Sequence, residues 1–474
     1  MSAIEVLTGN GKKQKIDTDG IEAIKSSLRG EVLLPGHERY DQAREIWNAM
    51  IDRKPAIIIQ CLGAADVKIA VDFAAKYNLL AAVRSGGHNI AGNAVCDDGL
   101  MIDLSQMKSV RIDQDSMLVH VEPGVSLGDL DHETQAFGLA TPVGINSTTG
   151  VAGLTLGGGF GWLSRKYGMT IDCLTAVDVV TADGKYIHAN KDNHSDIFWA
   201  VRGGGGNFGI ITRFEFQLYP VGPEVLAGLI VFPLEDAASA LKKYREYART
   251  LGDDTSVWVV MRQAPPLPFL PEDVHGKDVI VFALCHIGDL EEGKKIIEPI
   301  RSFGKMAGEH VGEMPFTAWQ QAFDPLLTPG ARNYWKSHNF NDISDEVIDL
   351  AIKYTKTLPS PQCEIFFAML GGETSRIAKD ATAYPHRDAN YLLNVHGRWD
   401  EAGDDEKCIG WARDFFNDSA PHATGGVYIN FMTEEETERV KSAYGPSFDR
   451  LKDIKKKYDP NNLFKLNQNI APSK

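Results

Sequence analysis

Three glycine-rich runs in the first half of the chain constrain its fold more than any other feature of the sequence. They lie at residues 84–88 (RSGGH), 157–161 (GGGFG) and 202–209 (RGGGGNFG). Glycine has no Cβ and adopts positive φ angles, so its backbone N–H groups can approach an anion closely. One such run alone would indicate only a tight turn in a β-rich domain. Three runs in one region favour a binding site for a large ligand that carries phosphate.

The third run contains a G-x-G-x-x-G pattern, formed by Gly204, Gly206 and Gly209. In a dinucleotide-binding βαβ unit this pattern follows a strand and opens a helix. Here residues 210–216 (IITRFEF) follow it, and their alternating β-branched, aromatic and polar side chains are typical of a strand. The sequence therefore argues against a nicotinamide-binding Rossmann fold at this position.

Composition and charge limit the classes of protein to which this chain can belong. Hydrophobic residues make up 43% of it and charged residues 24%, as in ordinary globular proteins. A net charge of −15 repels phosphate backbones, so no nucleic-acid partner is expected. The sequence has no apolar run long enough for a membrane span and no secretory signal, so no membrane partner is expected. The cysteines are too scattered for a metal site or a disulfide framework, and they favour reduced thiols in a cytoplasmic protein: Cys61, Cys96, Cys173, Cys285, Cys363 and Cys408.

The pattern of apolar residues divides the chain into three stretches and indicates an α+β fold. Up to about residue 220, short strands alternate with short helices, one of which is expected at 38–51. From 221 to 424, longer helical stretches separate strands, as expected for an antiparallel sheet covered by helices. A Pro-rich loop is expected at 264–271. The last fifty residues predict a strand at 427–432 and a long amphipathic helix at 434–457.

Several short motifs resemble those of the FAD-linked oxidases of the vanillyl-alcohol oxidase/p-cresol methylhydroxylase superfamily. The run 83–89 (VRSGGHN) is similar to the flavin-attachment loop of this family, and 150–159 (GVAGLTLGGG) is similar to its central glycine-rich segment. The motifs at 428–430 (YIN) and 467–470 (NQNI) resemble the closing motifs of the berberine-bridge-enzyme-like branch, of the bacterial 6-hydroxynicotine-oxidase type. Further similar segments lie at 102–105, 166–168, 180–184 and 198–203.

The resemblance implies a domain organisation. Residues 1–220 are expected to form a two-part FAD-binding domain of the p-cresol methylhydroxylase type, with its core at about 50–220. Residues 221–424 are expected to form a substrate-binding domain, whose antiparallel sheet is covered by helices. Residues 425–474 are expected to return to the FAD-binding domain.

The resemblance also implies FAD that is covalently attached through His88. In the family this histidine is bonded to the 8α carbon of the flavin, because a neutral imidazole is a nucleophile. Some relatives add a second bond from a cysteine to flavin C6. The matching position lies near Asn146, and no cysteine occurs between Cys96 and Cys173, so no second bond is expected. The expected FAD contacts are Arg84, Ser85, Gly86, Gly87, His88, Asn89, Gly150, Gly153, Leu154, Gly157, Gly158, Gly159, Gly161, Gly209, Ile211, Tyr428, Asn430 and Asn467.

The chemistry that the resemblance implies is hydride transfer to the flavin, assisted by a base that removes a proton from the substrate. Tyr428 is the first candidate for this base, with a purely structural flavin contact as its alternative. A phenol titrates at about pKa 10, so this base would need a nearby cation or an anionic reduced flavin. Asn394 and His396 share one face of an expected strand. Asn394 stands where relatives place Glu or Gln and is expected to form hydrogen bonds. His396 is a further candidate base, with an edge or surface position as its default, and Gln362 and Glu364 complete the candidates.

The expected partners are small molecules. The substrate is expected to be an alcohol, a sugar or a cyclic amine, and molecular oxygen is expected to accept the electrons. Two alternatives stay open from the sequence: a flavin dehydrogenase with another electron acceptor, and a flavin-binding protein without turnover.

Overall fold

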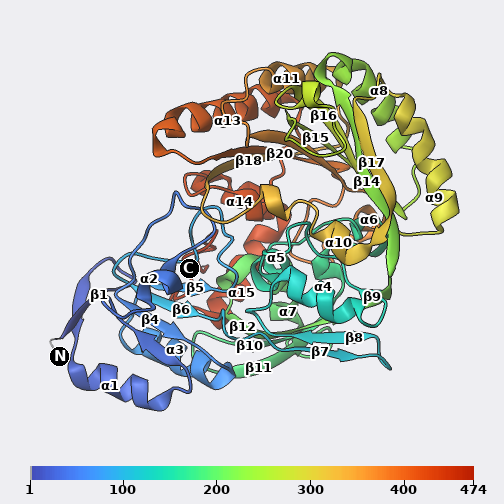
Figure 1. Cartoon of the computed structure of the whole chain (residues 1–474). Coiled ribbons are helices and arrows are strands. Elements are labelled where there is room, and N and C mark those ends of the chain that lie inside the picture. Colours follow the sequence, from blue (N-terminus) through green and yellow to red (C-terminus); the bar gives the residue numbers. More distant parts are fainter. Residues whose placement is uncertain (1–2, 474) are drawn as a thin grey trace.

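The structure, a computed structural model, describes residues 3–473. It consists of two parts that face each other (Figure 1). The lower part in this view contains the first 220 residues and most of the C-terminal segment, and the upper part is built around one large sheet. Helices and strands mix in both parts, so the predicted α+β fold class is confirmed.

The lower part contains two main sheets. In the four-stranded sheet, β4 and β5 pair in parallel with β6, and β3 adds an antiparallel edge. The five-stranded sheet is antiparallel throughout, in the order β11-β10-β12-β8-β7. The strands are β3 (Glu31–Leu33), β4 (Ile57–Gln60), β5 (Ala81–Arg84), β6 (Leu100–Asp103), β7 (Val110–Asp113), β8 (Leu118–Val121), β10 (Leu174–Val180), β11 (Tyr186–Asn190) and β12 (Ile210–Gln217).

Short elements complete the lower part. Two two-stranded ladders flank the main sheets, β1 (Ile4–Leu7) with β2 (Lys13–Ile16) and β9 (Leu139–Ala140) with β13 (Tyr219–Pro220). The helices are α1 (Thr18–Ser27), α2 (Tyr40–Arg44), α3 (Ala64–Lys76), α4 (Leu127–Gln135), α5 (Val151–Leu156), α6 (Ser164–Tyr167) and α7 (Ser195–Val201). The third glycine run forms a single 3-10 turn and leads directly into β12, so the prediction that it does not open a Rossmann helix is confirmed.

The upper part is a seven-stranded antiparallel sheet in the order β17-β14-β16-β15-β19-β20-β18. Its strands are β14 (Glu224–Pro233), β15 (Thr255–Gln263), β16 (Asp278–His286), β17 (Gly308–Pro315), β18 (Arg332–Phe340), β19 (Glu364–Met369) and β20 (Tyr391–Trp399). Successive side chains of a strand point to opposite faces, so each strand presents one set of residues to the helices and the other to the lower part.

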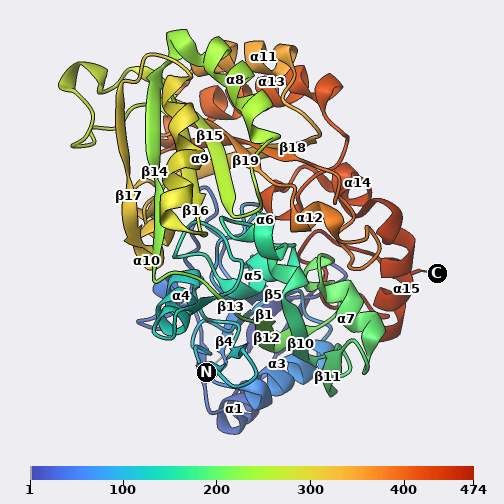
Figure 2. The ribbon, with the colours of Figure 1, turned by 90° about the vertical axis from the view of Figure 1, so that its right-hand side faces the viewer.

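Four helices cover the outer face of this sheet, on the side away from the lower part (Figure 2). They are α8 (Ala237–Ala248), α9 (Leu290–Ile297), α11 (Asp345–Thr355) and α13 (Asp405–Ser419), and shorter α10 (Phe316–Gln320) and α12 (Glu373–Arg376) lie at the junction with the lower part. The side chains of Asp289 and Ser344 accept hydrogen bonds from the first turns of α9 and α11, which fixes where these helices begin. The predicted antiparallel sheet covered by helices is therefore present.

The C-terminal segment packs on the lower part through a buried ion pair. Lys455 Nζ lies 2.7 Å from Asp459 Oδ2, and it also donates hydrogen bonds to the backbone oxygens of Asn207 and Phe464. Both side chains are inaccessible to solvent. Asp459 in turn accepts hydrogen bonds from the N–H groups of Leu463 and Phe464. This network ties α15 (Phe448–Tyr458) and the tail to the third glycine run.

Three predicted elements differ in the structure. The helix expected at 38–51 is only the five-residue α2, because Trp47 and Asn48 form tertiary hydrogen bonds instead of helical ones. The backbone N–H of Trp47 donates to Gly87, and the Asn48 amide joins the backbones of Ile90 and Asn333. Polar contacts with distant segments thus override the helical periodicity.

The strand expected at 427–432 is wrong, because Ile429–Phe431 form a 3-10 turn that pairs with no strand. The helix expected at 434–457 is also interrupted, and it forms α14 (Val440–Tyr444) and α15. Gly445 separates them with φ +47°, a conformation that L side chains rarely adopt, and Pro446 follows it. The Gly-Pro pair in the sequence could have predicted this break.

The expected Pro-rich loop at 264–271 is confirmed, because it follows β15 without forming a strand or helix before Glu272. All six cysteines are buried and free. Among residues 3–473, no helix has both the length and the apolar composition needed to cross a bilayer.

We expect Lys455→Ala to destabilise the protein by about 3–5 kcal/mol, because removal of one partner leaves Asp459 charged, buried and unpaired. The free energy of unfolding from a urea titration measures this loss. Lys441→Ala, on an exposed position of α14, is the control and should change stability by less than about 0.5 kcal/mol. Equal losses in the two variants would contradict the structural role of the ion pair.

Candidate active site

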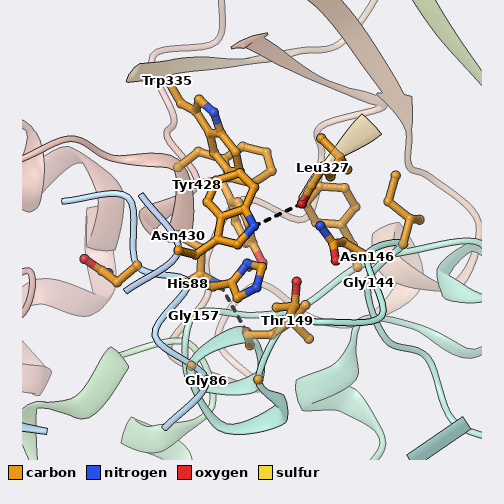
Figure 3. Close-up of a pocket in the computed structure, with 18 of the residues that line it drawn as sticks. Gly86, His88, Gly144, Asn146, Thr149, Gly157, Leu327, Trp335, Tyr428 and Asn430 are labelled. Atoms are coloured by element: carbon orange, nitrogen blue, oxygen red, sulfur yellow. Dashed lines mark hydrogen bonds between the residues drawn. The ribbon is translucent and has the colours of Figure 1, made fainter. Parts of the chain in front are cut away.

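A cavity of about 370 Å³ lies between the seven-stranded sheet and the glycine-rich loops. Figure 3 shows Trp335 on the sheet side of this cavity, Gly86 and Gly157 on the opposite side, and His88 between them. The C-terminal segment supplies Tyr428, which also lines the wall. Residues from all three sequence stretches therefore meet at one place.

The imidazole of His88 is held from two sides. The indole of Trp47 stacks on it, with ring centroids 5.0 Å apart and an interplanar angle of 21°. Its Nε2 lies 3.0 Å from Thr148 Oγ1, and the Thr148 hydroxyl donates to Asn146 Oδ1 at 2.7 Å. Because that hydroxyl gives its only proton to Asn146, it must accept the hydrogen bond from His88. The proton of the neutral imidazole is therefore on Nε2, and the lone pair is on Nδ1.

The charge state of His88 agrees with this arrangement. Burial lowers the pKa of the imidazole to about 3, and a hydrogen bond to the backbone of Thr148 only partly opposes this shift. His88 is thus neutral at physiological pH, with one nitrogen able to act as a nucleophile.

The register of the sheet brings three ionisable residues into one row on the cavity face. Arg262 of β15 lies opposite Glu364 of β19, and Glu364 lies opposite His396 of β20. Arg262 donates to Glu364 Oε2 at 2.7 Å, and His396 Nδ1 lies 3.2 Å from Glu364 Oε1. We call Arg262, Glu364 and His396 the charged row. All three line the cavity.

Glu364 is ionised in this environment. Burial by itself would raise its pKa, but Arg262 and His396 outweigh burial and hold the pKa at about 2. Burial lowers the pKa of His396, and Glu364 opposes that shift. The other ring nitrogen, Nε2, lies 3.2 Å from Asn333 Oδ1, whose amide nitrogen already donates to a backbone oxygen. The two nitrogens of His396 therefore each face an oxygen atom, one of Glu364 and one of Asn333.

Tyr428 presents a phenol whose oxygen accepts two hydrogen bonds. Gly159 N–H and Asn430 Nδ2 donate to it at 2.9 and 3.0 Å. Burial raises the pKa of Tyr428 to about 12, and these two donors lower it only in part. No cation contacts the phenol in the described chain, so it is protonated at neutral pH and keeps its own proton available as a hydrogen-bond donor.

Comparison with known proteins agrees with this geometry. A model described as an FAD binding domain matches residues 55–190, and a model described as berberine and berberine like matches residues 427–471. An FAD-linked oxidoreductase of Dictyostelium discoideum is 32% identical over 449 residues, which cover 94% of this chain and 95% of the relative. The chain belongs to the FAD-linked oxidoreductases.

Two further similarities place it more closely within this family. The (R)-6-hydroxynicotine oxidase of Paenarthrobacter nicotinovorans is 30% identical, over 94% of this chain and 97% of the oxidase. The crystal structure of 6-hydroxy-D-nicotine oxidase from Arthrobacter nicotinovorans superposes with a TM-score of 0.85 and 29% identity, and covers 94% of this chain and 99% of that one. The predicted resemblance to the vanillyl-alcohol oxidase superfamily and its berberine-bridge-like branch is thus confirmed.

The cavity of this FAD-linked oxidoreductase fits a flavin dinucleotide. Its floor is formed by residues of all three glycine runs, and a Cβ built on Gly153 or Gly206 would meet only open space. A ligand can therefore lie directly against the backbone there. Asn467 Oδ1, on the same wall, is a buried acceptor without a partner in residues 3–473, as expected where a ligand would donate a hydrogen bond.

Most of the predicted FAD contacts line this cavity, and their contact with FAD stays a prediction. They are Ser85, Gly86, Gly87, His88, Asn89, Gly150, Gly153, Leu154, Gly157, Gly209, Ile211, Tyr428, Asn430 and Asn467. Four others lie behind the wall. Arg84 pairs with Asp103, Gly159 donates to Tyr428, and Gly158 and Gly161 are packed against Met169 and Val143. These four support the site and do not form its surface.

The predicted catalytic residues divide in the same way. Glu364, His396 and Tyr428 line the cavity, and the edge or surface position expected for His396 is wrong, since only 3% of it is exposed. Gln362 lies before β19, bonded to Arg398 and Asp400, and is not on the wall. Asn394 shares the face of His396 as predicted, but it is fully buried behind the cavity, and its amide has no partner in the described chain. The hydrogen bonds predicted for Asn394 are therefore not formed with any residue in 3–473.

Several residues of the site were missed in the sequence. Trp47 and Thr148 hold His88, and Arg262 completes the charged row, yet none of them lies in a glycine run or a family motif. Arg262 had one available signal, because a charged residue at an inward position of an otherwise apolar strand is unusual. Trp47 had none, because its segment was predicted as an ordinary amphipathic helix.

The low pKa of Glu364 makes a pH-dependent contribution to stability. An unfolded Glu titrates at about 4.3, so the stabilisation is complete above that pH and is lost as the pH falls towards about 2. Between pH 6 and pH 3 the wild type should therefore lose about 2 kcal/mol more unfolding free energy than Glu364→Gln. Urea titrations at both pH values test this. The exposed control Glu401→Gln should keep the wild-type pH dependence. If Glu364→Gln lost as much unfolding free energy between pH 6 and pH 3 as the wild type, the ionised state of Glu364 would be contradicted.

Proposed function

We propose that this chain is a covalently flavinylated oxidase, which removes a hydride from a small hydroxylated substrate and passes the electrons to oxygen. The observation that carries this proposal is the state of His88. The residue is neutral and lines the cavity, and its Nε2 is occupied by Thr148, so Nδ1 is the nitrogen whose lone pair is free to act as a nucleophile. Covalent attachment through Nδ1 needs this tautomer, which Asn146 and Thr148 select.

FAD held in this cavity would supply a hydride acceptor and a route for two electrons to oxygen, so that alcohol and oxygen would give a carbonyl compound and hydrogen peroxide. The protein must take up the hydroxyl proton. Glu364 is the only carboxylate on the cavity wall within residues 3–473, and it is ionised. As the hydride leaves, the hydroxyl becomes a protonated carbonyl, which is a strong acid. A weakly basic carboxylate is then a sufficient proton acceptor.

The other two members of the charged row set the properties of Glu364. Arg262 orients it through a charge-assisted hydrogen bond, and His396 fixes its second oxygen.

Tyr428 has a different role in this proposal. Because its oxygen already accepts two hydrogen bonds and its pKa is about 12, it donates a hydrogen bond to the substrate oxygen and holds the hydroxyl in place.

Oxygen as the electron acceptor is supported by the similarity to a protein named as an oxidase, (R)-6-hydroxynicotine oxidase. Hydrogen peroxide formation in air tests this part of the proposal. A reduced flavin that is stable in air, but is reoxidised by a quinone, would identify a dehydrogenase instead.

The covalent link can be tested on the denatured protein. We expect flavin fluorescence to stay with the wild-type band after denaturing electrophoresis, and to be lost in His88→Ala. Thr148→Val removes the hydrogen bond that selects the tautomer, so covalent incorporation of FAD should slow about fivefold. Thr148→Ser keeps the hydroxyl and should incorporate FAD at the wild-type rate. Release of all flavin from denatured wild type would refute the link, and a normal rate in Thr148→Val would refute the tautomer argument.

The proton acceptor can be tested by anaerobic reduction of the flavin in a stopped-flow instrument. Glu364→Gln is nearly isosteric and should reduce the rate by roughly 10²- to 10⁴-fold, as general-base loss does. Tyr428→Phe should reduce it only about fivefold, because one hydrogen bond worth about 1 kcal/mol is lost. The opposite order of the two variants would make Tyr428 the base.

A further inference from the structure

Outside the charged row, the residues of the seven-stranded sheet that line the cavity are almost entirely apolar. The cross-strand register arranges its inward residues in rows, and each row crosses several strands. The two rows beside the charged row contain Val231, Val281, Val260 and Phe366, and then Leu229, Ala283 and Trp258. All seven of these residues line the cavity. The wall thus runs from the charged row across β15 and β16 to β14. Figure 2 shows the ribbons of these three strands.

The loop after β15 extends this apolar wall. Ala264, Pro265, Leu267 and Leu270 line the cavity, and Leu270 packs with Val279 and Val281 of β16. The loop is closed at its base, where the backbone of Ala264 bonds with Lys277 and Gly276. It therefore forms an ordered, apolar extension of the wall over β16 and β14, which begins beside Arg262 and leads away from Glu364 and His396.

The polar groups of the charged row are largely committed to one another and to the backbone. Arg262 donates to Glu364 and to the backbone oxygens of Gln263 and Pro361, and His396 bonds Glu364 and Asn333. The row offers a place for one polar substrate group, next to the carboxylate of Glu364. On the rest of the sheet wall, the only polar groups of the side chains within residues 3–473 are the indole N–H groups of Trp258 and Trp335, and each donor of this kind can serve only one hydroxyl.

This distribution discriminates between substrate classes. A sugar ring carries a hydroxyl on almost every carbon, and each hydroxyl buried without a partner costs about 1–3 kcal/mol. An apolar body gains free energy from the same wall, in proportion to the area it buries. The wall therefore favours a molecule with one polar end and one long apolar body.

We infer that the substrate of this enzyme is an alcohol with an extended apolar body, and not a carbohydrate. Its hydroxyl lies at Glu364 and its body lies along Val260, Val281 and Leu267 towards the loop after β15. The alcohol loses a hydride to the flavin and the hydroxyl proton to Glu364, and a carbonyl product remains. The inference rests on the proposed function, since it assigns the substrate of that same site.

A homologous series of alcohols tests the inference. The probes are benzyl alcohol and the ω-phenylalkanols up to 5-phenyl-1-pentanol, with glucose and cellobiose as the carbohydrate arm. Flavin absorbance is recorded anaerobically in the holoenzyme after each addition. Each added methylene should lower the concentration for half-maximal reduction about fourfold, as expected for burial in an apolar site. The two sugars should not reduce the flavin.

Matched variants locate the apolar body on the wall. Val281→Thr changes the shape little but adds a hydroxyl, and it should raise the half-maximal concentration for 5-phenyl-1-pentanol about tenfold, with little effect on benzyl alcohol. Val274→Thr makes the same change off the cavity wall, in the segment that joins the loop to β16, and should leave both values unchanged. Retention of flavin absorbance shows that each variant is folded and loaded.

Each outcome is decisive. Reduction by glucose or cellobiose as efficient as that by the longest alcohol, or no dependence on chain length, would overturn the inference. No reduction by any probe, in protein that contains its flavin, would also overturn it, while covalent FAD binding would stand. Protein without flavin would instead refute the proposed function itself.

Discussion

The site depends on one close contact between two glycines. Gly86 and Gly150 cross at a distance that leaves no room for a side chain, because a Cβ on Gly86 would lie 2.5 Å from the backbone nitrogen of Gly150. A Cβ on Gly150 would likewise lie 2.7 Å from the backbone of Gly86. This crossing holds the loop that contains His88 against the segment that contains Asn146 and Thr148. The hydrogen bonds that set the tautomer of His88 form only because the two backbones are this close.

The second constraint is the register of the seven-stranded sheet. Arg262, Glu364 and His396 are separated by up to 134 residues in the chain, yet they are direct cross-strand neighbours. A shift of one residue in the pairing of β15 with β19 would turn one of the partners towards the outer helices. The register therefore fixes both the charge of Glu364 and the two apolar rows that follow the charged row along β15.

The two halves of the site are joined by polar contacts that carry little sequence signal. Asn48 exchanges hydrogen bonds with the backbone of Asn333 in β18, and the indole of Trp47 donates to the backbone oxygen of Leu327. These contacts draw the segment after α2 across the cavity and place Trp47 on His88. They also explain why that segment is not a helix, since its side chains are used to connect distant elements.

The sequence by itself determined the ligand class and the positions where the backbone packs too closely for a side chain. Glycine at positions 86, 150, 157 and 209 reflects a local steric requirement, and such requirements can be read residue by residue. The same holds for the helix-covered sheet, whose apolar periodicity is local, and for the break at Gly445, which the sequence contained and the prediction overlooked. Only the tertiary structure decided which polar residues form the site. The charge state of Glu364, the tautomer of His88 and the burial of Asn394 all depend on residues that are far away in the chain. Strand register and loop packing decide where those residues lie.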